Sequence, residues 1–338
     1  MNKKTFLIIA LVFLLTLSAC SFSGQNSGKT KPGSQAGALS GKKIIFVGCS
    51  YTYYGGTVRR TEYNITSQEK RANDQGYFYQ LCKANGAEIS VMDWCYGGHS
   101  LTDLFGGSCK ATSVCIGYDH LADITDRYYD YVVLQEIKEP ADWTAQQYAD
   151  NVRSVMNVFR EANPNVRFYY VIHDGVYANK YSQAWKDSVP LIREEGAVIV
   201  DWGTLVWDII SGKAKVPGSE MEYNKNSFIV SNSASDGYHP NLLSGYLSAL
   251  MTYCAITGET AVGQPYAFCT DGTMEDVYFD MEKYVKSYYK WDDKSTAADE
   301  RATSFIEIFH SEADMKGLQT LADEYLKQFL GQSAEPQN

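Results

Sequence analysis

Short, continuously apolar segments alternate along the chain with longer segments in which apolar residues recur every three to four positions. The apolar segments are KIIFVG (43–48), EISVMDW (88–94), YDYVVLQE (129–136), VRFYYVIH (166–173) and AVIVDW (197–202). Continuous hydrophobicity in segments of this length is typical of parallel strands that are covered by helices on both faces. Five such strands are therefore predicted.

The intervening segments predict helices over 74–85, 118–127, 144–162 and 181–195, and a further helix that opens near Pro240. Proline in EANPN and glycine in EEGA stand where helices end. The alternation predicts an α/β fold, a three-layer α/β/α sandwich around a central, mostly parallel five-stranded sheet. We expect this domain over 41–270. The acidic, tyrosine-rich stretch 271–332 predicts a C-terminal helical extension packed on the domain, in preference to a separate domain.

The N-terminus has the pattern of an export signal. Lys3 and Lys4 precede an apolar stretch and then small residues ending at Cys20. LSAC at 17–20 resembles the lipobox of bacterial lipoproteins, which implies lipidation of Cys20 and an extracytoplasmic protein anchored to the cell membrane. An uncleaved anchor or an ordinary secretory signal is the alternative. Residues 1–20 are thus assigned to the signal, and the Ser- and Gly-rich residues 21–40 to a flexible linker.

Charge limits the classes of partner. The chain has 40 acidic residues against 30 Lys and Arg, a net charge of −10. This balance disfavours nonspecific binding to nucleic acid or to anionic lipid, so the N-terminal lipid is the only membrane contact expected. A neutral small molecule or glycan fits the charge better, and the oligomeric state stays open.

Cysteine spacing predicts disulfides more readily than metal binding. Cys109 with Cys115 and Cys254 with Cys269 are candidate local pairs, and Cys49 with Cys95 is a third, although spacing alone leaves the connectivity open. No C-x-x-C pair occurs and no cysteine or histidine cluster has ligand spacing, so no metal is expected.

Candidate chemistry begins at Ser50, which follows the first strand in GCSYTYYGG. The carboxyl ends of parallel strands are where such sheets bind their ligands. Asp236 and His239, in SASDGYHPN, precede a helix, and a histidine oriented by a carboxylate is the base that a serine nucleophile needs. Read singly, Ser50 caps a turn, Asp236 caps a helix and His239 is a surface residue.

Together these motifs resemble the SGNH hydrolases, also called GDSL esterases and lipases. Gly48-Cys49-Ser50 is similar to the first block of that family, Gly98 in YGGHSL to the second, and Asp236-x-x-His239 to the last. The third block departs from the family's Gly-x-Asn-Asp, because this chain has VVLQEI, where Gln135 supplies an amide in place of asparagine.

The resemblance implies a carboxylic ester hydrolase without cofactor. Ser50 would be the nucleophile, His239 the base and Asp236 its orienting acid. The oxyanion hole would consist of the Ser50 and Gly98 backbone amides and the Gln135 side chain. Cys49 is a weaker candidate nucleophile.

Other residues near the strand ends are assigned to substrate binding, namely Tyr51, His173, Tyr238 and Glu136, although Glu136 is better explained as support for neighbouring loops. The expected function is an extracytoplasmic serine esterase that hydrolyses O-acyl esters, acetyl esters foremost, on carbohydrate. An O-acyltransferase with the same residues, or a lipoprotein that binds glycan or solute without catalysis, is the alternative.

Overall fold

The computed structural model describes residues 35–53, 55–58, 76–95, 100–101, 127–136, 142–173, 182–229, 239–269 and 311–331. The strands are β1 (Lys43–Gly48), β2 (Ser90–Cys95), β3 (Tyr131–Leu134), β4 (Arg167–Ile172) and β5 (Ala197–Asp201). The α-helices are α2 (Ser50–Tyr53), α3 (Tyr77–Ala84), α6 (Ala145–Ala162), α7 (Gln183–Glu194), α8 (Trp202–Ile210), α9 (Leu242–Thr257) and α12 (Glu312–Gly331). Short 3-10 helices are η1 (Gln35–Leu39), η4 (Lys225–Ser227) and η5 (Ala267–Cys269).

The five strands form one parallel sheet in the order β2-β1-β3-β4-β5, which confirms the predicted fold class. Successive residues of a strand point to opposite faces. In β1, Ile44 and Phe46 join one apolar cluster while Ile45 and Val47 join another, on the other side of the sheet. Both faces of the sheet are therefore buried. This is why the strands lack the alternation of polar and apolar residues that a half-exposed sheet has.

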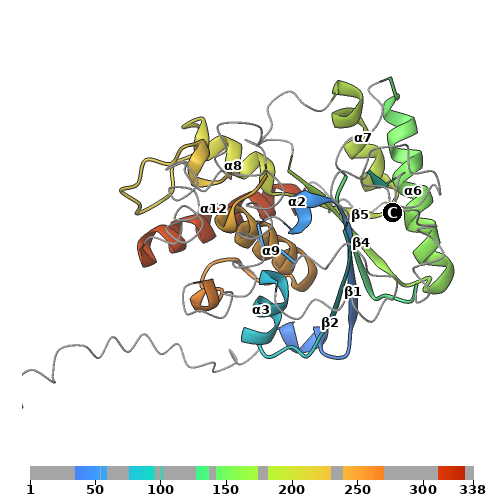
Figure 1. Cartoon of the computed structure of the whole chain (residues 1–338), viewed down its shortest axis with the longest axis horizontal. Helices are drawn as coiled ribbons and strands as arrows, with labels where there is room; N and C mark the ends of the chain where they lie inside the picture. Colours follow the sequence, from blue (N-terminus) through green and yellow to red (C-terminus); the bar gives the residue numbers. More distant parts are fainter. Residues whose placement is uncertain are drawn as a thin grey trace, which may run out of the picture.

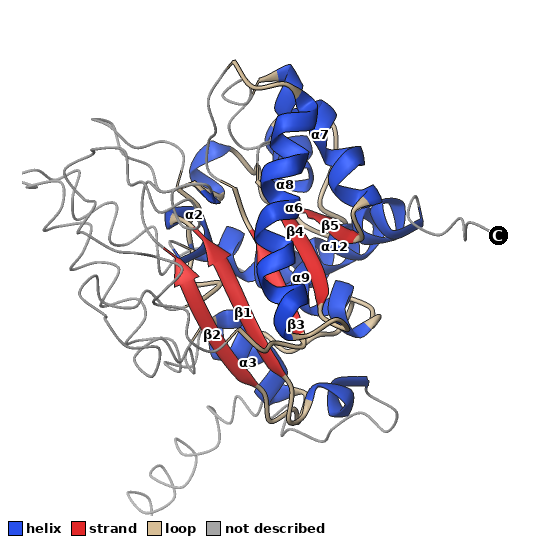
Figure 2. Cartoon of the chain, turned by 90° about the vertical axis from the view of Figure 1, so that its right-hand side faces the viewer, coloured by secondary structure: helices blue, strands red, loops and turns tan. Residues whose placement is uncertain are grey.

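Helices cover each face of the sheet. Helices α6 and α7 lie on one side, and α3, α8, α9 and α12 lie on the other (Figure 1). The view from the side shows the strands running in one direction, with α6 in front of β3 and β4 (Figure 2). The arrangement is the predicted three-layer α/β/α sandwich. Within the described ranges, no helix has the length and hydropathy needed to cross a bilayer.

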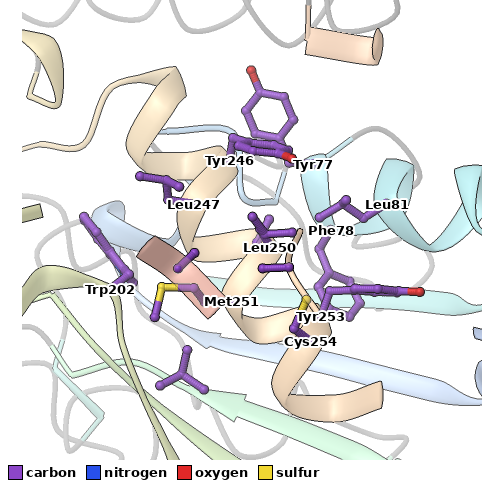
Figure 3. Packing of buried hydrophobic residues seen from close by; sticks show 14 of the residues in the cluster. Tyr77, Phe78, Leu81, Trp202, Tyr246, Leu247, Leu250, Met251, Tyr253 and Cys254 are labelled. Carbon is purple, nitrogen blue, oxygen red and sulfur yellow. The ribbon is translucent and has the colours of Figure 1, made fainter. Parts of the chain in front are cut away.

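Helix α9 is apolar around its whole circumference because it is enclosed on all sides. Figure 3 shows Leu250 and Met251 of this helix between Trp202 and the side chains of α3. Tyr246 meets Tyr77 of α3 edge to face, with ring centroids 6.0 Å apart. The helix begins at Leu242, two residues after Pro240: Asn241 is the N-cap, and its side chain accepts hydrogen bonds from the backbone amides of Leu243 and Ser244.

A contact between two glycines brings α9 against the segment that follows α2. A Cβ atom on Gly245 would overlap the backbone of Gly55, and one on Gly55 would meet the backbone of Gly245 and Asn241. The Thr57 hydroxyl, two residues further on, donates to the Gly245 carbonyl at 3.0 Å. Only glycine permits backbones to approach this closely. The contact places the N-terminal end of α9 beside α2.

Helix α12 packs on β5, α8 and α9. The Tyr325 hydroxyl donates to Asp208 at 2.6 Å, Gln319 donates to the Tyr246 hydroxyl at 2.9 Å, and Asp323 accepts from the Ala261 amide at 3.0 Å. This segment therefore completes the core over the sheet face that it covers. The division of the chain at residues 20, 40 and 270 stays a prediction.

Some sequence expectations are wrong. Cys254 is a free thiol inside α9 and is not bonded to Cys269, although both side chains are buried in the same apolar cluster. Cys49 and Cys95 are also free, and the Cys95 thiol faces the Phe46 carbonyl at 3.5 Å. Helix α8 was not expected, since it follows β5 without an intervening loop. The pair Cys109 and Cys115, and the helix predicted over 118–127 up to its last residue, lie outside the described residues.

Replacing Gly245 by alanine should destabilise the fold by about 1–3 kcal/mol, the usual cost of overpacking, although alanine favours a helix by about 1 kcal/mol over glycine elsewhere. Urea unfolding measures the change. Gly331→Ala is the matched control, because a Cβ at this last residue of α12 would meet nothing within 4 Å. Equal stability of Gly245→Ala and Gly331→Ala would contradict the glycine contact.

Candidate active site

Ser50 lies at the carboxyl edge of the sheet, where the chain leaves β1 and turns at once into α2. It is the first residue of that helix and is 7% exposed. Gly48 ends the strand, and a Cβ there would meet Thr52 and Gln135. The absence of a side chain at position 48 thus lets the turn close over the end of β3, and Ser50 is presented at a fixed place on the rim.

His239 meets Ser50 from a distant part of the chain. Its Nε2 atom lies 2.9 Å from the Ser50 Oγ atom. Two contacts hold the backbone next to it: Pro240 bridges to Ile229, and the Asn241 side chain donates to the Ser227 carbonyl at 2.9 Å. Contacts with residues 227–229 therefore hold the backbone beside His239, just before α9. They keep the imidazole within hydrogen-bond distance of Ser50.

Gln135 follows β3 and is 3% exposed. Its amide oxygen accepts a hydrogen bond from the Thr52 hydroxyl, and its Nε2 atom lies 3.3 Å from the Nδ1 atom of His173. With the amide oxygen on the threonine, the NH2 group faces the histidine. Nδ1 then accepts, and the neutral ring carries its proton on Nε2.

His173 follows β4 and is 1% exposed. Burial, and to a smaller extent the neighbouring His239, lowers its pKa from 6.5 to about 3. The Tyr51 ring lies 4.3 Å from its ring, centroid to centroid, and the Trp202 ring lies 6.5 Å away and is stacked on it. His173 is thus a neutral, enclosed residue that supports the site from within the protein, and its expected contact with substrate stays a prediction.

Glu136 is buried beside Gln135 and contacts the segment that follows β2. Its Oε1 atom accepts from the Leu101 backbone amide at 3.1 Å. A carboxylate that accepts from a backbone amide orders the loop to which that amide belongs. This contact fits the interpretation of Glu136 as loop support, and its assignment to substrate binding stays a prediction.

Cys49 precedes the serine but is fully buried. Burial is the main cause that raises the pKa of its thiol, and Glu136 raises it further. Because the thiolate and not the thiol is the nucleophile, a cysteine in this environment is unreactive. The geometry favours Ser50, which has an imidazole at hydrogen-bond distance.

Several predicted site residues lie outside the described residues: Asp236, Gly98, Tyr238 and Cys20. The structure therefore brings together Ser50, His239, Gln135, His173, Glu136 and Tyr51 at one edge of the sheet. Sequence reasoning gave no role to Thr52 or Trp202.

The arrangement suits proton transfer from a hydroxyl. An imidazole nitrogen 2.9 Å from a serine oxygen can accept its proton as that oxygen attacks an electrophile. Within the described part of the chain, no group of three or more His, Cys, Asp or Glu side chains is placed to bind a metal ion.

No protein-family model and no curated protein matches the chain. Among solved structures, it is similar to a mutant of an acetyl-xylooligosaccharide esterase from Geobacillus stearothermophilus, with 15% identity, 65% of this chain and 94% of that chain covered, and a TM-score of 0.40. A putative GDSL-like lipase from Parabacteroides merdae has 16% identity, coverage of 65% and 96%, and a TM-score of 0.41. A DUF4886 family protein from Bacteroides uniformis has 14% identity, with 84% of this chain and 94% of that chain covered, and a TM-score of 0.44. These likenesses assign no activity to this chain, whose chemistry follows from its own side chains.

Acid should destabilise the protein through His173. The unfolded state has a histidine pKa near 6.5 and the folded state one of about 3, so the unfolded state binds more protons between these values. Stability is then complete above about pH 6.5 and falls as the pH drops through the interval, by at most about 1.4 kcal/mol per pH unit.

The variant His173→Phe keeps a ring but cannot titrate. Between pH 7 and pH 5 we expect the unfolding free energy of the wild type to fall by about 2 kcal/mol more than that of the variant, as measured by urea titration at each pH. Parallel pH curves would contradict the buried, neutral state of His173.

Proposed function

We propose that this chain is a serine esterase of the SGNH type, with Ser50 as the nucleophile and His239 as the general base. The observation that carries the proposal is the 2.9 Å approach of His239 Nε2 to Ser50 Oγ at the carboxyl edge of a parallel sheet. Residues 189 positions apart meet there, and both stand at the ends of secondary-structure elements. Serine and histidine in this relation form the nucleophile and base pair of acyl transfer.

In the proposed reaction, the Ser50 oxygen attacks the ester carbonyl while its proton passes to His239 Nε2. The tetrahedral intermediate then collapses, the bond to the leaving alcohol breaks, and His239 returns the proton to that alcohol. Water repeats both steps on the acyl-enzyme and releases the acid. Asp236, three residues before the histidine, is assigned to its Nδ1 side, where a carboxylate stabilises the imidazolium.

The oxyanion would be stabilised by the Ser50 and Gly98 backbone amides and by Gln135. Of the two hydrogens on the Gln135 amide nitrogen, one is directed at His173 Nδ1. The second is the donor that we assign to the oxyanion. One such donor typically accounts for about 3 kcal/mol of barrier. Because Thr52 holds the amide oxygen, the donor is oriented before substrate arrives.

The substrate we propose is an O-acyl ester, acetyl in the first instance, on a neutral carbohydrate. The acidic chain disfavours anionic partners. Tyr51, partly buried beside the serine, offers an aromatic face of the kind that sugar rings contact. An O-acyltransferase would use the same residues and differ by admitting a sugar hydroxyl in place of water.

The place of action we propose is outside the cytoplasm, with lipidated Cys20 in the membrane and residues 21–40 as the tether. The apolar stretch that ends in LSAC supports this. A surface-anchored esterase would meet polymeric glycans directly.

Ser50→Ala and His239→Ala should each lower kcat for an aryl acetate by at least about 10³-fold, because the nucleophile and its base act as one unit. Cys49→Ala should retain activity within about threefold. A fluorophosphonate probe, followed by mass spectrometry of the labelled peptide, should label wild type and Cys49→Ala but not Ser50→Ala. Labelling of Ser50→Ala equal to wild type would reject the assignment.

Hydrolysis of acetylated and butyrylated forms of one sugar should separate the acyl preferences. We expect kcat/KM to be at least about tenfold higher for acetyl, as two extra methylenes must find room beside the enclosed serine. Adding an unacylated oligosaccharide tests the alternative function. Acyl transfer exceeding acid release would establish the acyltransferase.

A further inference from the structure

Two side chains hold the Gln135 amide, one at each end. The Thr52 hydroxyl donates to the amide oxygen, and the amide nitrogen lies 3.3 Å from His173 Nδ1. Thr52 stands in the short helix α2, two positions after Ser50, and is 4% exposed. The SGNH hydrolases have an asparagine where this chain has Gln135, and glutamine is one methylene longer. Because the longer side chain has one more rotatable bond, its amide needs a further restraint to point in one direction.

The contact between Thr52 and Gln135 depends on the glycine that ends β1. A Cβ on Gly48 would overlap the Thr52 Oγ1 atom, and it would lie 3.1 Å from the Gln135 carbonyl oxygen and 3.2 Å from the Gln135 Cβ. The absence of a side chain at position 48 therefore lets the hydroxyl reach the residue that follows β3. The segment that carries the nucleophile and the segment that carries the amide are joined here, side chain to side chain.

The Thr52 hydroxyl has a second neighbour, the thiol of Cys95 at the end of β2. This thiol donates to the Phe46 carbonyl at 3.5 Å. Sulfur is a weak acceptor, so the amide oxygen of Gln135 is the better partner for the hydroxyl proton. A buried acceptor that loses its donor is destabilised, and rotation of the amide is one way to recover a partner. Loss of the Thr52 hydroxyl should therefore disturb the direction of the Gln135 amide.

We propose that Thr52 is a positioning residue for the oxyanion donor: its hydroxyl holds the Gln135 amide so that the second N–H of Nε2 is directed at the oxyanion. The inference rests on the proposed esterase function, and it makes the donor after β3 depend on the threonine of α2. In this role Thr52 touches neither the substrate nor the reacting atoms and acts only through Gln135. An oxyanion forms in the transition state and not in the bound ester, so a misdirected donor should lower kcat and leave KM unchanged.

The test is a double-mutant cycle in the full-length protein. Thr52→Val keeps the size of the side chain and removes the hydroxyl, whereas Thr52→Ser keeps the hydroxyl. We expect Thr52→Val to lower both kcat for an aryl acetate and the rate of fluorophosphonate labelling by at least about tenfold, with KM within about twofold. Thr52→Ser and Cys95→Ala, which removes the second neighbour of the hydroxyl, should stay within about threefold of wild type. In a Gln135→Ala protein, Thr52→Val should change neither rate by more than about twofold.

Equal losses from Thr52→Val in the wild-type and Gln135→Ala backgrounds would overturn the proposal, because the threonine would then act through α2 and not through the amide. A change in KM alone would also overturn it. Nitrogen-15 shifts test the direction of the amide without catalysis. In wild type, His173 should carry its proton on Nε2, and a proton on Nδ1 would mean a reversed amide and reject the proposal.

The same nitrogen signals separate a failure of the positioning role from a failure of the esterase function. If no protein is hydrolytic or labelled, the esterase function fails, and the His173 Nδ1 signal then decides the positioning role alone. A shift of that signal in Thr52→Val but not in Thr52→Ser would retain the role, and no shift in either would reject it. If Thr52→Val does not fold, Thr52→Ala removes the same hydroxyl with a smaller side chain.

Discussion

The close approach of two backbones at Gly55 and Gly245 is the constraint on which the site depends. It presses the start of α9 against the segment that leaves α2. Ser50 begins α2 and His239 stands two residues before the cap of α9, so the spacing of these two helices sets the distance between Ser50 and His239. The 2.9 Å contact between His239 Nε2 and Ser50 Oγ thus depends on packing several residues away from both side chains. The extra Cβ of Gly245→Ala would therefore disturb the Ser50–His239 contact as well as the packing of the core.

The second constraint is that polar groups beneath the serine are buried and must be satisfied by one another. Thr52, Gln135 and His173 form a chain of neutral hydrogen bonds that joins α2 to the ends of β3 and β4. In this chain Thr52 donates to the amide oxygen, and the amide NH2 group faces His173 Nδ1. These hydrogen bonds therefore hold the site in place from its buried side. These three side chains carry no charge, and the charged group buried beside them is Glu136.

Much of the fold could be predicted from the sequence because both faces of the sheet are covered. Continuous apolar runs such as KIIFVG mark the strands, and the five strands lie within two residues of their expected ends. Helix α8 was missed because it starts at Trp202, within the segment taken as the fifth strand, where the apolar run gives no break. The pairing of Ser50 with His239 followed from motif order. The contacts of Tyr51 and His173 did not, because they depend on side-chain directions at the ends of different strands. The expected pairs of Cys254 with Cys269 and of Cys49 with Cys95 failed for a related reason, because spacing along the chain does not show where two cysteine side chains point.

The buried and unreactive thiol of Cys49 can serve as a probe of local opening. It lies directly under the turn that carries Ser50, and no reagent can reach it while that turn is closed. Alkylation of Cys49 by a small electrophile would occur only when the turn opens transiently. The rate of alkylation would therefore measure how often the turn that carries Ser50 opens. Cys49 is thus an internal reporter of local opening around Ser50.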